Sequence, residues 1–295
     1  MTTAADRRTG MLFALGAYLS WGLVPLYWRA LGPVPPFELL AHRVLWSLVL
    51  AVVALLVQGR LSTALRPLAS RRTAITLAAS TLLIGANWVV FILAVQTGRL
   101  LHASLGYYIS PLVSVVFGLG FLGERLRPGQ KVAVALAVVG VLVLVLAARV
   151  LPWIAVALAV SFALYGLLRK VAPVDALVGL YLETLLLAPL AAGYLFVRAR
   201  SGVHLAGATP AALAALALAG PITAVPLLFY TGATRRLPLS MVGFFQFLSP
   251  TSQFLIAVAV FGETATRTHL LAFAFIWASM AVFVVEARRA APSPP

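Results

Sequence analysis

The stretch "ISPLVSVVFGLGFLGERL" (Ile109–Leu126) returns later in the chain as "LSPTSQFLIAVAVFGETA" (Leu248–Ala265). In both stretches a proline is followed, at the same distance, by a Gly-Glu pair. Pro111 of the first stretch and Pro250 of the second are separated by 139 residues. Each stretch lies inside a long apolar run, so the recurrence indicates that a whole structural unit is written twice.

The composition assigns the chain to the integral membrane proteins. Of its 295 residues 62% are hydrophobic and 10% are charged, and the mean hydropathy is +1.04. A soluble domain is nearer half apolar and a quarter charged. A soluble fold of this length would not have enough polar residues to cover so large a core, so we expect membrane-spanning helices.

Ten apolar runs are long enough to cross a bilayer, which takes about 20 residues per helix. The first run resembles a signal peptide because it follows two arginines, but its length and the similar runs after it favour a retained span. The connections between runs are short and leave no room for an inserted soluble domain. The predicted spans are 10–31, 37–58, 73–95, 101–122, 129–147, 152–170, 175–197, 210–234, 239–261 and 267–286.

The basic residues orient the chain. With ten spans both termini lie on one side, and fifteen of the 22 lysine and arginine residues fall on that side, six on the other and one, Arg43, within a span. Cytoplasmic loops carry the excess of basic residues, so both termini are expected in the cytoplasm. The net charge of +15 is thereby explained. The basic residues are dispersed between apolar runs, which argues against binding to nucleic acid.

The 139-residue offset extends beyond the opening stretches; Ser110, for example, matches Ser249. We therefore expect two five-helix units, residues 1–149 and residues 150–295. Because five is odd, the second unit enters the membrane from the opposite side. The predicted fold class is an all-α membrane protein of two inverted five-helix repeats, an arrangement that many secondary transporters use. Duplication without transport, as in a membrane enzyme or a scaffold, is the alternative.

Several motifs resemble the RarD-type branch of the EamA family in the drug/metabolite transporter superfamily, and the resemblance covers nearly the whole chain. They are "AYLSWGLVPLYW", "ELLAHRVLWS", "GANWVVF", "ASLGYYISPL", "GERLRP", "SFALYGLLRK", "LETLLLAP" and "TAVPLLFY". The resemblance implies a ten-helix inverted-repeat carrier that exports small metabolites across the bacterial inner membrane. It also implies that spans one, three, four, six, eight and nine line the cavity.

Spans four and nine each carry a polar stripe at helical spacing, where lipid-facing polar groups would be costly. We expect these spans to form paired walls of the substrate path, although polar contacts between packed helices would explain the stripes equally well. The stripe residues are Tyr107, Ser110 and Ser114 in span four, and Gln246, Ser249 and Gln253 in span nine.

A proline in each of these spans strengthens the prediction. Proline leaves the carbonyl four residues earlier without its donor, so Pro111 frees the carbonyl of Tyr107 and Pro250 that of Gln246. Freed carbonyls in a membrane are tolerated where they line a cavity or are buried in protein. Other spans supply further helix breakers and deep polar or aromatic residues, for which lining and plain packing both remain open: Trp21, Pro25, Asn87, Trp88, Tyr165 and Pro226.

Three ionisable residues lie within spans. Glu183 is expected either to couple transport to protons or to pair with a base such as Arg43, Arg169 or Lys170. Arg43 either extends to the outer surface or meets an anionic group of the solute. His42 is either a packing residue or a proton relay.

Glu124 and Glu263 end spans four and nine, beside Arg125 and Arg267. Their expected role is structural, through local ion pairs or anchoring of the loops. The alternative is gating, in which the acid at each mouth engages a partner in one state only.

Together these patterns predict an exporter of small amphipathic metabolites or drugs that works by alternating access, with proton antiport or facilitated diffusion as its mode. The few charges within spans favour neutral or zwitterionic solutes. The chain has no GxxxxGK[ST] loop, no HExxH motif and no cysteine, so no ATP, cofactor or metal is expected, and an enzyme is disfavoured. A neutral channel remains a rival. The Ala/Val-rich spans five and ten are expected to face lipid or a second protomer.

Overall fold

The apolar runs form helices, since a helix satisfies its backbone hydrogen bonds internally where no water is available. In the computed structural model the described residues are all except 1–3, 33, 98, 149–152, 202–208 and 290–295. The helices are α1 Ala4–Leu31, α2 Pro36–Val57, α3 Arg71–Gln96, α4 Leu100–Leu122, α5 Pro128–Ala148, α6 Trp153–Val171, α7 Ala176–Arg200, α8 Pro210–Arg236, α9 Leu239–Gln246, α10 Leu248–Ala259 and α11 Arg267–Arg289, with short 3-10 turns η1 Leu61–Thr63 and η2 Arg66–Ala69.

Within the described ranges the chain supplies ten candidate membrane spans, as the sequence predicted. Nine of them are single helices, and α9 and α10 together make the remaining one, Leu239–Ala259. The predicted ends agree with the helices to within a few residues, except that α1 begins earlier, at Ala4. The expected all-α membrane fold is confirmed.

Span nine is one candidate span, Leu239–Ala259, as predicted. Its helical hydrogen bonding is interrupted at Phe247, which separates α9 from α10. Pro250 cannot donate to the carbonyl of Gln246, and Gln246 is the last residue of α9. The helix therefore breaks where the proline removes its hydrogen bond. Its counterpart α4 continues through Pro111.

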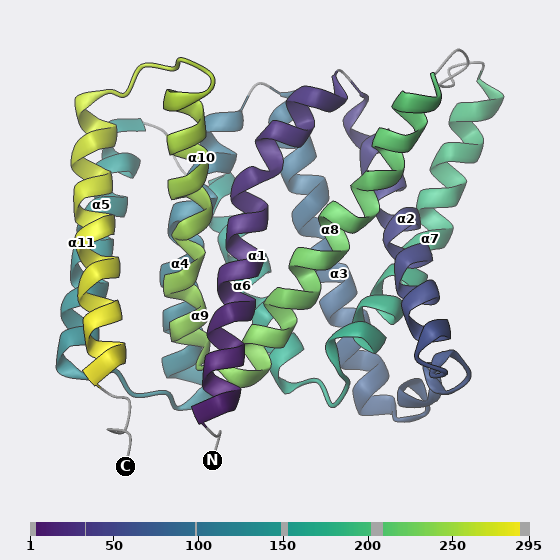
Figure 1. The fold of residues 1–295 in the computed structure, drawn as a ribbon, viewed down its shortest axis with the longest axis horizontal. Coiled ribbons are helices and arrows are strands. Elements are labelled where there is room, and N and C mark those ends of the chain that lie inside the picture. Colours follow the sequence, from purple (N-terminus) through teal and green to yellow (C-terminus); the bar gives the residue numbers. More distant parts are fainter. Residues whose placement is uncertain (1–3, 33, 98, 149–152, 202–208, 290–295) are drawn as a thin grey trace.

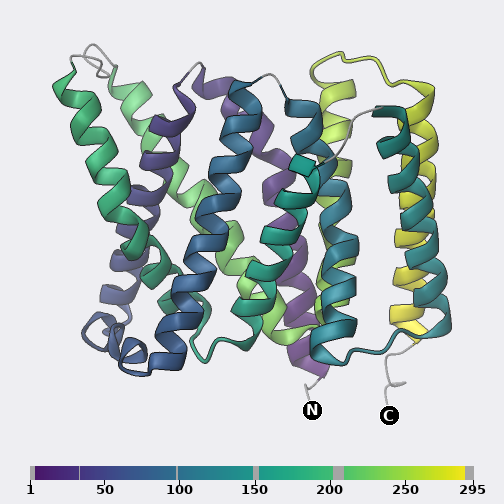
Figure 2. The same ribbon diagram turned by 180° about the vertical axis from the view of Figure 1, so that it is seen from behind.

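The helices cross the bundle in alternating directions (Figure 1). α1 begins and α11 ends at the same face, which is called the terminus face below; the opposite face is called the far face. The view from behind in Figure 2 shows the same alternation for α3 to α6. The connections between α2 and α3, α4 and α5, α6 and α7, and α8 and α9 lie at the terminus face.

The two halves of the chain interleave. α4 and α3 of the first half pack on α6 of the second half, α1 packs on α8 and α10, and α2 packs on α7 and α8. The interior is therefore built from both halves together. The predicted boundary between units, at residues 149 and 150, lies outside the described residues, and the division into two units stays a prediction.

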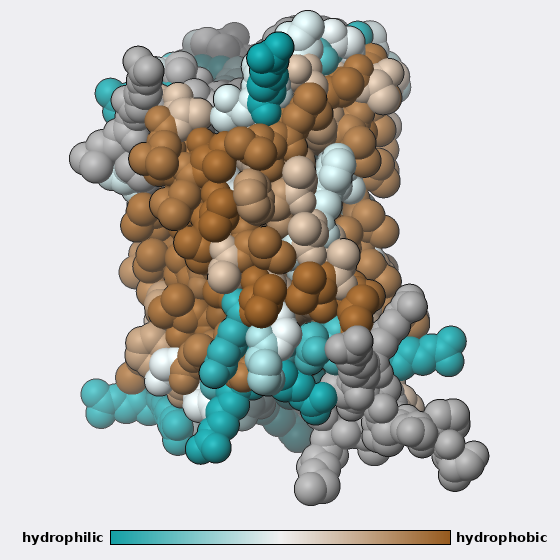
Figure 3. All heavy atoms as spheres, turned by 90° about the vertical axis from the view of Figure 1, so that its left-hand side faces the viewer, coloured by the Kyte–Doolittle hydropathy of each residue, from teal (hydrophilic) through white to brown (hydrophobic). Residues whose placement is uncertain are grey.

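Helices α5 and α11 pack on each other at one edge of the bundle. Gly140 allows the close approach, since a Cβ there would lie 2.9 Å from the carbonyl oxygen of Ala272. Seen from that side, the surface is an apolar band with hydrophilic residues above and below it (Figure 3). Leu142 and Leu146 are among the exposed apolar side chains of α5. This band has the character of a lipid-facing surface.

The ends of α4 and α10 have the same backbone geometry. The glycine before Glu124 has φ 64° and the glycine before Glu263 has φ 71°, the left-handed conformation that commonly ends a helix. In both turns the glutamate N–H donates to the carbonyl six residues earlier, from Glu124 to Gly118 at 3.0 Å and from Glu263 to Ala257 at 2.9 Å. These four residues are themselves related by the 139-residue offset.

Candidate functional site

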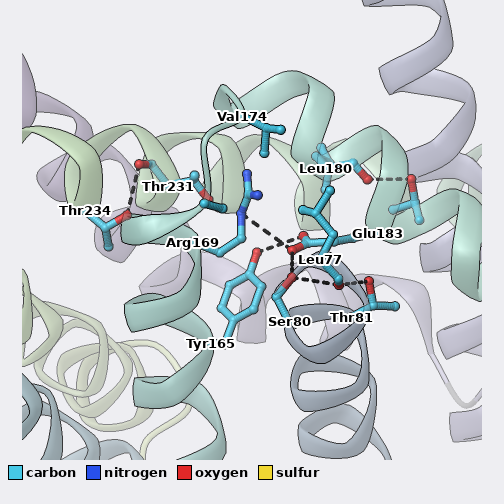
Figure 4. Close-up of polar contacts among 12 residues, drawn as sticks. Leu77, Ser80, Thr81, Tyr165, Arg169, Val174, Leu180, Glu183, Thr231 and Thr234 are labelled. Carbon is cyan, nitrogen blue, oxygen red and sulfur yellow. Dashed lines mark hydrogen bonds and ion pairs between the residues drawn. The ribbon is translucent and has the colours of Figure 1, made fainter. Parts of the chain in front are cut away.

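A buried ion pair connects α6 and α7 (Figure 4). Nε of Arg169 lies 3.5 Å from Oε1 of Glu183, and the side chains are only 1% and 4% exposed. Glu183 also accepts hydrogen bonds from the Ser80 hydroxyl of α3 at 2.6 Å and from the Tyr165 hydroxyl at 3.2 Å. Of the bases considered from the sequence, Arg169 is the one that meets Glu183.

Gly179 of α7 makes room for the Arg169 guanidinium. A Cβ atom on Gly179 would overlap both terminal nitrogens of that side chain. One terminal nitrogen donates to the Asp175 carbonyl at 3.3 Å, while Nε and Nη1 have no hydrogen bond to a described residue. The guanidinium is thus held by a single carboxylate, so losing that carboxylate would leave a buried charge uncompensated.

An aromatic cluster adjoins this pair. Trp21 of α1 lies 5.7 Å from Phe162 of α6 and 5.8 Å from Tyr230 of α8, between ring centroids. Tyr230 stacks on Tyr165 at 6.1 Å. Since Tyr165 also donates to Glu183, the cluster connects the ion pair to α1 and α8, where apolar parts of a solute would find aromatic surface.

The carbonyl that Pro25 frees on α1 has a partner from the other half of the chain. Nε2 of Gln253 donates to the Trp21 carbonyl at 3.2 Å and to the Ser249 hydroxyl at 3.3 Å. Three residues singled out from the sequence therefore meet between α1 and α10.

Asn87 has a different environment. Its amide donates to the Leu158 carbonyl and to the Ser161 hydroxyl, both at 2.9 Å. Both donors of the side chain are used to bind α3 to α6. This residue matches the alternative of polar contacts between packed helices. Pro226 is buried in α8.

α4 packs on α9, which carries Gln246 of the second stripe, whereas Ser249 and Gln253 lie on α10, which packs on α1. Gly243 of α9 packs against Ser114 of α4, at 3.1 Å from a built Cβ to the serine Cβ. Ser110 Oγ and Gln246 Oε1 are buried and have no hydrogen-bond partner among the described residues. Buried polar atoms are normally paired, so these two are exceptions within the described part of the chain. Tyr107, one turn before Ser110, is 38% exposed.

Arg43 is held inside the bundle on the far-face side. Its Nε donates to Thr223 Oγ1 of α8 at 2.9 Å, and its guanidinium carbon lies 5.0 Å from the Trp88 ring centroid of α3. His42 is half-buried and has no hydrogen bond in the described part of the chain. The three ionisable residues of the prediction are therefore not brought together: Glu183 meets Arg169, and Arg43 meets Thr223.

Glu124 caps the start of α9. Its carboxylate accepts hydrogen bonds from the backbone N–H of Leu239, from the N–H of Ser240 at 2.9 Å and from the Ser240 hydroxyl at 2.6 Å. A carboxylate at a helix N-terminus is favoured by unpaired N–H groups and by the helix dipole. The lack of a side chain on Gly118 is required, since a Cβ there would lie 2.5 Å from Glu124 Oε2.

Of the two structural roles expected for Glu124, anchoring is the one observed. Glu263 behaves differently although its backbone turn is the same. Its side chain is exposed and has no hydrogen-bond or ion-pair partner among the residues whose side chains the structure describes.

Further contacts close the terminus face. Lys170, at the end of α6, donates to the carbonyls of Thr234 and Leu237 at the end of α8. Arg235 of α8 donates to the carbonyl of Ala172 at 2.9 Å. Basic side chains at the C-terminal ends of helices satisfy carbonyls that lack partners. These bonds join α6 to α8 beside the Glu124 cap.

Asp175 forms another contact between the halves at this face. It caps α7 by accepting from the Val178 N–H at 3.0 Å and pairs with Arg60, which follows α2. Partial burial favours the neutral acid, but the hydrogen bonds from Val178 and Arg60 outweigh it and lower the pKa of Asp175. The carboxylate is therefore charged across the neutral pH range.

Three residues of this region were not identified from the sequence: Ser80, Gly179 and Tyr230. Two of them carried a usable signal. Ser80 is seven residues before Asn87, on the same helix face, and Gly179 is four residues before Glu183. Tyr230 had none, because an aromatic residue in an apolar helix is equally common in plain packing.

Comparison with known proteins agrees with this fold. The sequence profile of the EamA-like transporter family matches residues 8–146. Protein RarD of Salmonella typhi is 46% identical over 285 residues, covering 96% of this chain and 97% of the relative. An uncharacterized transporter of Vibrio cholerae is 44% identical over 286 residues, covering 97% of this chain and 95% of the relative.

A crystal structure with 22% sequence identity superposes with a TM-score of 0.74 and covers 96% of this chain and 99% of that one. At this identity the likeness supports the fold alone. The bacterial relatives and the ten apolar helices of the described ranges together make this a multi-pass bacterial membrane protein.

Proposed function

The chain belongs to the RarD branch of the EamA-like transporter family, and from this premise we propose that it is a secondary carrier that exports small amphipathic metabolites or drugs by alternating access. The proposed solute path runs between the two halves, along α1, α3, α4, α6, α8 and α9–α10. It passes Arg43 on the far-face side, the stripes of α4 and α9 in the middle, and the Arg169–Glu183 pair nearer the terminus face.

The observation that carries the proposal is the difference between the two ends of α4 and α9–α10. At the terminus face Glu124 caps α9 across the halves. At the far face Glu263 follows a glycine turn of the same geometry, but its side chain is exposed and has no partner among the described residues. A carrier alternates between states in which one mouth is closed and the other is not. We propose that Glu124 holds the terminus mouth closed in this conformation.

The proposed inverted repeat explains why the two ends would differ in one state and exchange roles in the other. Under the 139-residue offset Leu239 and Ser240, which Glu124 caps, correspond to residues 100 and 101 at the start of α4. In the alternate state Glu263 would cap α4 as Glu124 caps α9 here. The matching turns at Glu124 and Glu263 support the repeat. The helix packing supports it as well. The contact of α3 with α6 corresponds to that of α8 with α1, and the contact of α4 with α6 corresponds to that of α9–α10 with α1.

The orientation follows from the basic residues. Their excess at the terminus face supports an orientation in a bacterial inner membrane with both termini in the cytoplasm. In that orientation the Glu124 cap closes the cytoplasmic mouth, and the conformation described faces outward. Export would require the opposite state to receive its solute from the cytoplasm.

Glu183 is the proposed coupling acid. It is the carboxylate at the centre of the polar contacts in Figure 4, and its partner Arg169 lies on α6, a helix of the proposed path. Protonation of Glu183 would release Arg169 and so remove the ion pair that links α6 to α7. A facilitator in which the pair is purely structural is the second candidate, favoured by the complete burial of both side chains.

An enzyme is disfavoured because the family consists of transporters. We propose that the apolar edge made by α5 and α11 is the surface on which a second copy of the chain would pack in a homodimer. Cross-linking of a Leu142→Cys variant in membranes would detect that contact, because the chain has no other cysteine.

The test is accumulation in proteoliposomes. The purified protein is given a mixed pool of amino acids, small metabolites and chloramphenicol under an imposed pH gradient, and the vesicle contents are read by mass spectrometry. Concentration of one solute against its gradient, abolished by a protonophore, is the expected result. Empty vesicles and the protein without a gradient are the controls.

Equilibration with saturable counterflow but without concentration would replace proton coupling by facilitated diffusion. Equilibration without saturation or counterflow would indicate a channel. No movement of any solute in the pool, by a protein shown to be folded and reconstituted, would count against the transport proposal.

A further inference from the structure

Arg43 is a permanent positive charge inside the membrane, seven residues after the first residue of α2. At the rise of an α-helix this places it about 10 Å from the helix start. A guanidinium at that depth is costly unless it has a partner or a function.

Protein contacts hold this guanidinium in one place. Nε donates to Thr223 Oγ1 at 2.9 Å, and Thr223 itself donates to the Ala219 carbonyl at 2.7 Å, so the acceptor is fixed to its helix. The Trp88 ring lies 5.0 Å away, within the range of a cation–π contact. The side chain therefore bridges α2, α3 and α8 and does not extend to the outer surface.

Among the described residues no carboxylate pairs with this charge. Their ion pairs join Arg60 to Asp175, Arg169 to Glu183 and Arg198 to Glu38. Glu38, five residues before Arg43 on α2, is thus paired with a different arginine.

The outer edge of the guanidinium is open. Nη1 and Nη2 of Arg43 have no hydrogen bond to a described residue, and unlike Nη1 of Arg169 they are not enclosed by protein. The terminal nitrogens of a guanidinium form the fork that binds a carboxylate through two parallel hydrogen bonds.

Aromatic side chains lie near this guanidinium. Besides Trp88, they are Tyr27 and Tyr107, whose phenol groups interact electrostatically with Arg43. Tyr107 contacts Phe91 with ring centroids 6.1 Å apart and is 38% exposed. A planar or apolar body attached to a carboxylate would rest on these rings.

We propose that Arg43 is the carboxylate-binding residue of the solute path and that the solute class is monocarboxylates with an apolar, preferably aromatic, body. Nη1 and Nη2 hold the carboxylate, Thr223 and Trp88 fix the guanidinium, and Tyr27 and Tyr107 contact the body. The inference rests on the proposed function for its biological meaning. The binding itself requires only the geometry around Arg43.

The test compares an acid with its uncharged analogue. Binding of 3-phenylpropanoate and of 3-phenylpropanamide to the full-length protein in lipid nanodiscs is measured by calorimetry at pH 7.5. The acid is expected to bind at least about tenfold more tightly, as hydrogen bonds to charged groups allow. In Arg43→Gln this preference falls to near unity, and in Arg43→Lys it is intermediate, because an ammonium lacks the fork.

The matched control is Arg200→Gln. Arg200 also contacts an aromatic ring, Phe196 at 4.7 Å, but within its own helix α7 at the far face. This variant should keep the full preference for the acid. Thermal unfolding of each variant shows whether it is folded, and Arg43→Lys decides the matter if Arg43→Gln does not fold.

Equal binding of acid and amide by the native protein, binding of neither, a preference that survives in folded Arg43→Gln, or an undiminished preference in folded Arg43→Lys would overturn the inference. Transport of a solute without a carboxylate, unaffected by Arg43→Gln, would overturn it as well and leave the proposed function standing. Selective binding of the acid without transport of any solute would leave the site standing and count against the proposed function.

Discussion

Gly243 of α9 lies against the backbone carbonyl of Pro111 in α4, so closely that a Cβ atom on the glycine would be 2.7 Å from that oxygen. This contact joins the two helices that carry the polar stripes, at the proline of one of them. Because the neighbour is backbone, it cannot move aside as the end of a flexible side chain would.

Gly243→Ala is therefore expected to destabilise the protein by about 1–3 kcal/mol, the usual cost of overpacking. The measurement is thermal unfolding of the purified protein in detergent. Gly120→Ala is the control, because a Cβ on Gly120 of α4 would meet nothing within 4 Å. Equal unfolding temperatures for the two variants would show that α4 and α9 are not packed as described.

Substitutions at two glycines of α7, Gly179 and Gly193, test how the buried Arg169 side chain packs. Gly179→Ala places a methyl group where the Arg169 guanidinium lies and should separate it from Glu183. Breaking a buried ion pair costs about 3–5 kcal/mol. Gly193→Ala on the same helix meets nothing within 4 Å and should have little effect. Comparable stability of the two variants would contradict the burial of Arg169 over Gly179.

The coupling role of Glu183 gives a third prediction. Glu183→Gln keeps the hydrogen bonds of the side chain but cannot take up a proton, so accumulation driven by a pH gradient should be lost while solute counterflow continues. Proteoliposome uptake measures both. Asp175→Asn is the control, since it changes another carboxylate that is paired with an arginine, outside the path. Unchanged pH dependence in Glu183→Gln would return Glu183 to a structural role.

The cap at the terminus face can be tested with single cysteines, because the chain has none of its own. Ser114→Cys is buried on α4. Its labelling from the terminus side by a membrane-impermeant maleimide should rise several-fold in Glu124→Ala, since a helix cap is worth about 0.5–2 kcal/mol.

Glu263→Ala should not raise this labelling, because Glu263 makes no described contact to lose in this conformation. A matched increase from both substitutions would reflect general loosening of the bundle and remove the gating role of Glu124.

Gln246 provides the fifth prediction. Its buried Oε1 has no partner among the described residues, so Gln246→Ala should weaken solute binding about 2–10-fold, as loss of one hydrogen bond worth about 0.5–1.5 kcal/mol would. Half-saturation concentrations in counterflow measure the effect. Gln130→Ala, at a half-buried position near the start of α5 that accepts from the Arg127 N–H, should leave them unchanged. Unaltered affinity for every accepted solute would exclude Gln246 from the site.

The sequence predicted the spans well because their length is set by the thickness of the bilayer. The run predicted as 37–58 is α2, Pro36–Val57. The sequence also identified Pro25 as a helix breaker. The carbonyl that it leaves without a donor is that of Trp21, because a proline acts on the residue four positions earlier.

Contacts between distant parts of the chain could not be predicted in the same way. Three bases were open partners for Glu183, and only the packing of α3 against both α6 and α7 brings Arg169 to it. The cap of Glu124 on Ser240 joins residues 116 positions apart. No periodicity in the sequence reports such a pairing.

The interruption at Phe247 makes the two walls unequal. α9 and α10 are separated by this one residue, whereas α4 runs unbroken through Pro111. If the walls exchange shapes during transport, one helix must become continuous while the other is interrupted, and their sequences do not make those changes equally easy. The inward and outward states would then differ in free energy, with about a tenfold difference in resting population for each 1.4 kcal/mol. Even without an energy source, such a protein would have different half-saturation concentrations on its two sides.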